Sequence, residues 1–154
     1  MAVDGLPLAE FGFPGPLRDR LVAAILRGEK TSTTGLYEEY LRKGTPVEAV
    51  GQRELVVDSA DRGVAVLETT GVEVKRLADV DLEFAIDEGE GFETLEQWRD
   101  AHLRFFTSPE MTAALGDPPV EIDDDTLVVC SRFRVVERRD GPDARQLYDR
   151  PAAS

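Results

Sequence analysis

The sequence contains very little cysteine and histidine, with one residue of each among its 154 residues. The lone Cys130 can form no internal disulfide, and no Cys and His residues cluster at the spacing of a metal site. We therefore expect a cytoplasmic protein without a metal or other cofactor. The sequence also lacks an apolar run near the roughly 20 residues that cross a bilayer, and it shows no basic and apolar leader. No membrane partner and no export signal are expected.

Positive charge is also scarce, because 18 Lys and Arg residues stand against 31 Asp and Glu residues, for a net charge of -13. Such a surface repels phosphate backbones and anionic lipid head groups. We expect no strong nonspecific nucleic-acid binding and favour a ligand of nucleoside size or a short RNA. Four arginines near the end of the chain alternate along a predicted strand and are more typical of its solvated face than of a basic patch: Arg132, Arg134, Arg138 and Arg139.

The length fits one domain with a core of its own, and the sequence shows no internal repeat. Residues 1–15 predict an apolar arm laid on the domain, and residues 138–154 predict a loosely held tail. Between them, apolar periodicity predicts helices at 17–27, 36–43, 82–86, 94–106 and 111–115 and strands at 54–58, 64–74 and 126–136. This order indicates an α+β fold, with a small curved mixed sheet or open barrel and flanking helices.

One polar stretch stands out between Gly28 and Gly35, where a single lysine is followed by four hydroxyl side chains. A helix ends just before it, so Lys30 lies just past a helix end. Serine and threonine hydroxyls compete for backbone hydrogen bonds, which predicts a turn or an extended segment with Thr31 and Ser32 available to a ligand. A purely structural polar connection is the alternative interpretation.

Lys30 and Thr33 form a candidate catalytic pair. A threonine hydroxyl is a weak nucleophile until a base removes its proton, and a desolvated lysine can act as that base. A proton donor is then needed, and the loop that contains Glu88 and Glu90 offers two carboxylates on a glycine-rich backbone. The role of Lys30 as a base conflicts with a position beside these carboxylates, because they favour its ammonium form. If both glutamates lie close, we expect Lys30 to be a protonated electrostatic clamp.

The residues also resemble a known family. Gly28, Lys30 and Thr33 match the G-x-K-x-x-T signature of ASCH domains, a branch of the PUA-like superfamily. The later run from Phe84 to Gly91, with the segments 95–102 and 105–106, is similar to bacterial single-domain ASCH proteins. The resemblance covers about residues 13–136, and we take residues 1–137 as one such domain with an N-terminal arm. It implies a PUA-like small β-barrel with flanking helices and a cleft for RNA or a nucleoside.

In the branch of the family that cleaves the acetyl group from N4-acetylcytidine, a lysine, a threonine and a glutamate do the work. Carried over by motif, Lys30 would be the base, Thr33 the nucleophile and Glu88 the proton donor of a metal-independent amidohydrolase. The chain departs from that branch in its greater length, in lacking an acidic residue soon after Thr33, and in having Gly89-Glu90-Gly91. A noncatalytic module that binds RNA or a modified nucleotide, and an RNA-cleaving ASCH protein, are the alternatives.

Three residues on the helix predicted at 94–106 complete the candidates. Trp98 and His102 lie on its apolar face at a four-residue step, which predicts a core tryptophan and a hydrogen-bonded packing histidine. Arg99 flanks that face and is expected to pair with Glu88 or Glu90, orienting them toward a ligand. Glu90 and Arg99 therefore join Thr31 and Ser32 as predicted ligand-binding residues.

Overall fold

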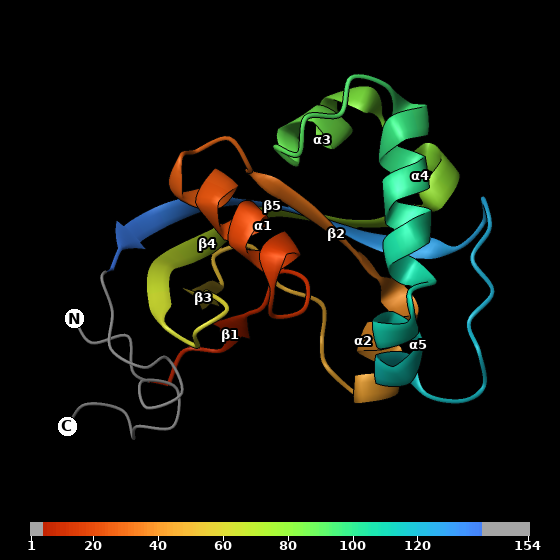
Figure 1. Ribbon diagram of the computed structural model, residues 1–154, viewed down its shortest axis with the longest axis horizontal. Coiled ribbons are helices and arrows are strands. Elements are labelled where there is room, and N and C mark those ends of the chain that lie inside the picture. Colours follow the sequence, from red (N-terminus) through yellow and green to blue (C-terminus); the bar gives the residue numbers. More distant parts are fainter. Residues whose placement is uncertain (1–4, 140–154) are drawn as a thin grey trace.

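The computed structural model describes residues 5–139 and contains one mixed sheet of five strands with helices around it (Figure 1). The strands follow the order β1-β3-β4-β5-β2 across the sheet, and their bounds are β1 Leu8–Ala9, β2 Ser32–Leu36, β3 Arg53–Val57, β4 Gly63–Arg76 and β5 Leu127–Arg138. Strands β1 and β3 run parallel, whereas the other neighbours are antiparallel. The sheet does not close, because β1 and β2 form its two separate edges.

Within residues 5–139, five α-helices and one short 3-10 helix flank the sheet: α1 Pro16–Leu26, α2 Tyr37–Lys43, η1 Leu77–Asp79, α3 Leu82–Asp87, α4 Leu95–Phe106 and α5 Pro109–Leu115. Helix α4 begins with a capping box, in which Thr94 and Gln97 each bond to the other's backbone N–H. Helix α1 begins with Pro16 and ends next to Gly28, whose φ of 78° is the left-handed conformation that glycine adopts freely. Among the described residues, no helix is both long and apolar enough to cross a membrane.

The predicted α+β class and the pairing of the strands are confirmed. Strands β3 and β4 form the expected hairpin, and β5 pairs along nearly the whole of β4, with Thr69 opposite Phe133. The hydroxyl-rich stretch is extended, as one of the two alternatives proposed, and forms the edge strand β2 against β5. Threonine favours this outcome, because its branched Cβ suits a pleated sheet.

The two ends of the chain refine the predicted boundaries. The N-terminal arm contributes its own short strand, since Leu8 and Ala9 in β1 pair with Leu55 and Val56 in β3. Arg138 is not in a loose tail but is the last residue of β5, and its guanidinium donates a hydrogen bond to the carbonyl of Leu26. The rest of the predicted tail, residues 140–154, lies outside the described residues, as do residues 1–4.

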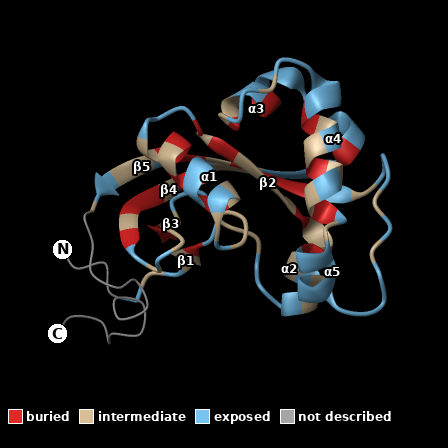
Figure 2. Ribbon diagram, in the orientation of Figure 1, coloured by how far each residue is buried: buried red, intermediate tan, exposed pale blue. Residues whose placement is uncertain are grey.

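Among the described residues, three apolar clusters lie along the sheet, whose strands are largely buried (Figure 2), and two of these clusters connect the sheet to helices. One joins Val22 and Ile25 of α1 to Ala65, Leu67 and Phe133 of the central strands. The other joins α3 and α4 to β2 and β5, and contains Leu36, Phe84, Ala85, Trp98, Phe106, Val128 and Cys130. The segment that starts at Lys30 leads from the end of α1, which packs in the first of these clusters, to Leu36 in the second.

Candidate functional site

A cavity of about 1350 Å³ opens between the N-terminal arm, α1, β2, α2, the loop after α3 and α4. Three of the predicted site residues line it together, namely Lys30, Thr33 and Glu88, and Glu90 lines it as well. Apolar and aromatic side chains cover much of the remaining wall, among them Phe11, Phe13, Phe92, Phe105 and Phe106. Polar and charged side chains make up the other part of the wall, and a concave space in which polar groups converge is a candidate small-molecule site.

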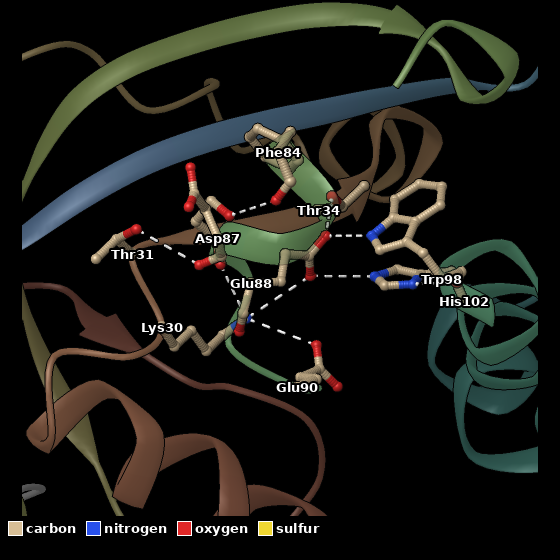
Figure 3. Close-up of polar contacts among 10 residues, drawn as sticks. Lys30, Thr31, Thr34, Phe84, Asp87, Glu88, Glu90, Trp98 and His102 are labelled. Atoms are coloured by element: carbon tan, nitrogen blue, oxygen red, sulfur yellow. Dashed lines mark hydrogen bonds and ion pairs between the residues drawn. The ribbon is translucent and has the colours of Figure 1, made fainter. Parts of the chain in front are cut away.

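Lys30 is buried, with only 2% of its side chain exposed, and lies beside two carboxylates (Figure 3). Its Nζ is 3.7 Å from Oε1 of Glu88 and 3.8 Å from Oε2 of Glu90. The same Nζ donates hydrogen bonds to the carbonyls of Ser32 and Glu88, at 2.9 and 3.3 Å. An ammonium has three N–H groups for these acceptors, whereas a neutral amine would direct its lone pair at the carboxylates. The geometry therefore favours the protonated clamp over the base.

Glu88 is 1% exposed and follows the last residue of α3 as its C-cap. Its Oε2 accepts hydrogen bonds from the hydroxyl of Thr34 at 2.8 Å and from the indole N–H of Trp98 at 2.6 Å. Its Oε1 is 3.2 Å from Nε2 of His102. We call these five residues, Lys30, Thr34, Glu88, Trp98 and His102, the Glu88 network.

The surroundings of Glu88 stabilise its carboxylate form. Burial by itself raises the pKa of Glu88, but the hydrogen bond and charge of His102, the charge of Lys30 and the indole of Trp98 together hold the pKa below its usual range. Burial lowers the pKa of His102, but the hydrogen bond and charge of Glu88 outweigh burial, so the pKa of His102 is raised above its usual value. A carboxylate that is hydrogen-bonded to Thr34, Trp98 and His102 and paired with Lys30 has no proton to give at neutral pH. The geometry thus does not favour the predicted role of Glu88 as proton donor.

Glu90 lies at the more open side of the cavity, with 24% of its side chain exposed. Burial is the main cause that raises the pKa of Glu90, and the charge of Glu88 adds to it while Lys30 opposes it. Its position depends on Gly89, where an added Cβ would lie 2.5 Å from the carbonyl oxygen of Glu29 and 2.7 Å from Cα of Lys30. Gly89 also has a φ of 71°, so the loop after α3 reaches the start of β2 only with glycine here.

The hydroxyl side chains of β2 divide between the two faces of the sheet. Thr34 bonds to Glu88, and Ser32 donates to the carbonyl of Phe84 on the same face, with no exposed surface. Successive residues of a strand point to opposite faces, so Thr33 lies on the other face, opposite Ser131 of β5. Thr33 therefore lines the cavity outside the Glu88 network, and the predicted nucleophile is not in that network.

Two other predicted ligand-binding residues contact the protein itself. The backbone N–H and the hydroxyl of Thr31 both donate to the carbonyl of Asp87, at 2.8 and 3.4 Å, which joins β2 to α3. Arg99 was expected to pair with Glu88 or Glu90, but its guanidinium forms an ion pair with Asp124 instead. Arg99 projects from the exposed side of α4, because Trp98 and His102 occupy the inward face of that helix. It is not among the residues that line the cavity.

A second polar group lines the cavity on the face that carries Thr33. The carboxylate of Glu48 accepts hydrogen bonds from the phenol of Tyr40 at 2.6 Å and from the hydroxyl of Ser131 at 3.2 Å. Burial and the neighbouring charge of Glu48 raise the pKa of Glu54 to about 7. We call these four residues, Tyr40, Glu48, Glu54 and Ser131, the Glu48 group.

Glu88, Glu90 and His102 each place one potential metal-ligating atom within 4.8 Å of the others. Lys30 lies beside both carboxylates of this set, at less than 4 Å from each. A metal ion at this point would meet the ammonium at close range, so the lysine would have to move before the three groups could bind one. The geometry favours Lys30 as the cation of this set.

Sequence reasoning did not assign functional roles to Thr34, Trp98 and His102 of the Glu88 network. The signal for Thr34 was its place two residues after Ser32, on the same face of an extended segment. The signal for the other two was the four-residue step from Trp98 to His102, which places both rings on one side of α4; the rings stack with centroids 4.2 Å apart. That step predicted a core tryptophan and a hydrogen-bonded packing histidine, and it did not indicate that Glu88 is the partner of both rings.

Comparisons with known proteins bear on the family of this chain. The sequence model of the ASCH domain matches residues 9–137. The solved ASCH domain from Lactobacillus crispatus JV V101 is 32% identical, with a TM-score of 0.67 over 78% of this chain and 72% of that one. A protein from Enterococcus faecalis V583 is 28% identical, with a TM-score of 0.75 over 86% of this chain and 77% of that one. The comparison with curated proteins gives no match.

Proposed function

The chain belongs to the ASCH domain family, and we propose on this premise that its cavity binds a nucleoside-sized ligand and hydrolyses an amide bond on it. The substrate class is an acylated nucleoside, and the activity is that of a small metal-independent amidohydrolase. One observation carries the proposal: the buried Lys30 and Glu88 meet on the wall of the same cavity that Thr33 and Glu90 line. Buried charges are costly, so a pair held at a cavity wall is a candidate functional group.

The proposed reaction divides the work among three residues. The hydroxyl of Thr33 attacks the acyl carbonyl, the bond to nitrogen breaks, and water then releases the acyl group from the threonine. Because Thr33 lies on the other face of β2, Glu90 accepts the threonine proton through one water and returns it to the departing amine, a role that suits a carboxyl whose pKa is raised by burial. The ammonium of Lys30 stabilises the negative oxygen that develops on the carbonyl. Glu88 stays ionised and holds Lys30 in place.

The experiment is hydrolysis of N4-acetylcytidine and related acyl nucleosides by the wild type and by Thr33→Ala. The variant should lose turnover and keep nearly unchanged ligand affinity by calorimetry, because the hydroxyl acts mainly in the transition state. Thr112→Ala is the matched control, since Thr112 is exposed on α5 and should keep wild-type turnover. Turnover that survives Thr33→Ala would contradict the nucleophile assignment.

A noncatalytic module for a modified nucleoside is the second candidate, and one observation favours it. Lys30 donates to two backbone carbonyls and lies beside Glu88, whose carboxylate accepts from Thr34 and Trp98, so contacts within the protein already hold both charged groups. In that case Lys30→Ala weakens affinity, while Thr33→Ala costs about one hydrogen bond, roughly 0.5–1.5 kcal/mol. Tight binding with no turnover of any acyl nucleoside would favour the module. The net charge of -13 favours a nucleoside over long RNA in either case, and we propose the cytoplasm as the location.

A further inference from the structure

His102 is the single histidine of the chain and is 8% exposed, packed against Glu88 at the C-terminal end of α3. Its two ring nitrogens have different partners. Nδ1 is 2.8 Å from the backbone carbonyl oxygen of Trp98, and Nε2 is 3.2 Å from Oε1 of Glu88. A carbonyl oxygen only accepts hydrogen bonds, so Nδ1 carries a hydrogen. The protonation of Nε2 is then decided by the carboxylate that it faces.

Three protonation states are conceivable for the pair of His102 and Glu88. A neutral ring beside an ionised carboxylate would set a lone pair of Nε2 against the lone pairs of Oε1. A neutral ring beside a protonated Glu88 would give the oxygen a hydrogen to donate, but it would remove the charge that faces the buried ammonium of Lys30. An imidazolium beside a carboxylate satisfies every donor and acceptor. Only the last state agrees with all the contacts.

The aromatic surroundings of His102 support the same state. Its ring is stacked on Trp98 with centroids 4.2 Å apart, and Phe106 and Phe92 lie with their centroids at 5.8 and 6.0 Å. The faces of aromatic rings attract a cation. The charged groups that face the ring are Glu88 from the end of α3 and Glu90 from the following loop, with Lys30 beyond them. No other titratable group among the described residues is in contact with the imidazole.

We propose that His102 is a positioning residue, held as an imidazolium that fixes Glu88 as a carboxylate and through Glu88 fixes Lys30 at the cavity. The site then loses its fixed arrangement at alkaline pH, because loss of the Nε2 proton leaves two lone pairs facing each other and Glu88 is no longer held by His102. Only the effect on turnover rests on the proposed function. The protonation state and its link to Glu88 are properties of the folded protein and are measured without any substrate.

The test is NMR of the full chain with 15N-labelled histidine, in which one ring gives all the signals. At pH 7.5 both ring nitrogens should be protonated, and the titration midpoint should lie above the ordinary value for histidine, about 6.5. Glu88→Gln should lower that midpoint, since Gln keeps the shape and removes the charge. Glu48→Gln is the matched control and should leave it unchanged, because Glu48 is held by Tyr40 and Ser131. A ring protonated only on Nδ1 at pH 7.5 would overturn the proposal. A titration midpoint that is the same in Glu88→Gln as in the wild type would also overturn it.

A second variant separates positioning from simple packing. His102→Gln keeps a side-chain N–H donor without the titrating charge, so any acyl-nucleoside turnover should lose its fall at alkaline pH while its KM changes little. If His102→Gln keeps the alkaline fall of the wild type, His102 is not its source and the positioning role is contradicted. If no acyl nucleoside is turned over, the proposed function fails, and the NMR result still decides the state of His102.

Discussion

The two polar clusters on the walls of the cavity differ in how their charge is compensated. In the Glu88 network, three hydrogen-bond donors, Thr34, Trp98 and His102, contact one buried carboxylate, and Lys30 forms an ion pair with it. In the Glu48 group, Glu48 accepts from two hydroxyls, and within residues 5–139 no lysine or arginine forms an ion pair with Glu48 or Glu54. The charge of the first cluster is therefore compensated by nearby cations, whereas in the second cluster the uncompensated Glu54 has a pKa of about 7.

The largest expected contrast is in stability. Glu88→Ala leaves the buried Lys30 and His102 without their carboxylate, and the loss of one partner from a buried pair typically costs about 3–5 kcal/mol. Glu48→Ala should cost only about 1 kcal/mol, because Tyr40 and Ser131 lose hydrogen bonds that water can partly replace. Urea denaturation at pH 7 measures both free energies of unfolding. Similar losses for the two variants would show that the clusters do not differ in this way.

A smaller effect is expected in how the stability of the fold depends on pH through Glu54 of the Glu48 group. The folded pKa of Glu54 is raised to about 7, so the folded state holds a proton that the unfolded state releases near the ordinary pKa of glutamate, about 4.5. Glu54 therefore stabilises the fold below about pH 4.5 and loses that contribution as pH rises through 7. Glu88 has the opposite sign, because its pKa is lowered and its contribution is lost as pH falls.

Glu54→Gln removes this pH-dependent contribution. The variant should match the wild type at pH 4 and exceed its stability at pH 8 by about 1–2 kcal/mol, a value reduced from the full shift because the side chain is partly solvated. The free energies come from urea denaturation of both proteins at several pH values. A difference between the two proteins that stays constant with pH would contradict a shifted carboxyl at this position.

The smallest effect is expected outside both clusters. Arg99→Ala removes an ion pair with Asp124 in which the two side chains are 40% and 61% exposed. Pairs of this kind contribute about 0–1 kcal/mol. Stability and any turnover or nucleoside binding should thus stay near the wild type. A loss of ligand affinity in this variant would restore Arg99 to the site where the sequence first suggested it.

The regular elements were predictable because their signals are local. Apolar residues at helical spacing mark α1 and α4, and the Val-rich and Thr-rich runs mark β3, β4 and β5. The family resemblance supplied the pairing of Lys30 with Glu88, which are 58 positions apart. No local pattern contains that contact, because it depends on where the end of α3 lies relative to the start of β2.

The rest of the site depends on the directions in which side chains point, and the order of residues in a sequence does not contain these directions. Thr33 and Thr34 are equivalent in composition, and the face of β2 decides which of them reaches Glu88. Arg99 is one residue from Trp98, and that single step of about 100° turns it from the inward side of α4 to the exposed side. For His102, the apolar face was evident, but the polar partner came from a separate helix.

Gly89 limits how this chain can diverge or be redesigned. Any other residue there would bring its Cβ against the backbone of Glu29 and Lys30, and backbone atoms cannot move aside as a flexible side chain does. Position 90 has no such restriction, because its side chain extends toward the open part of the cavity. Substitutions at Glu90 can therefore test its proposed proton transfer without disturbing the path of the loop. A library that varies the cavity should keep glycine at position 89.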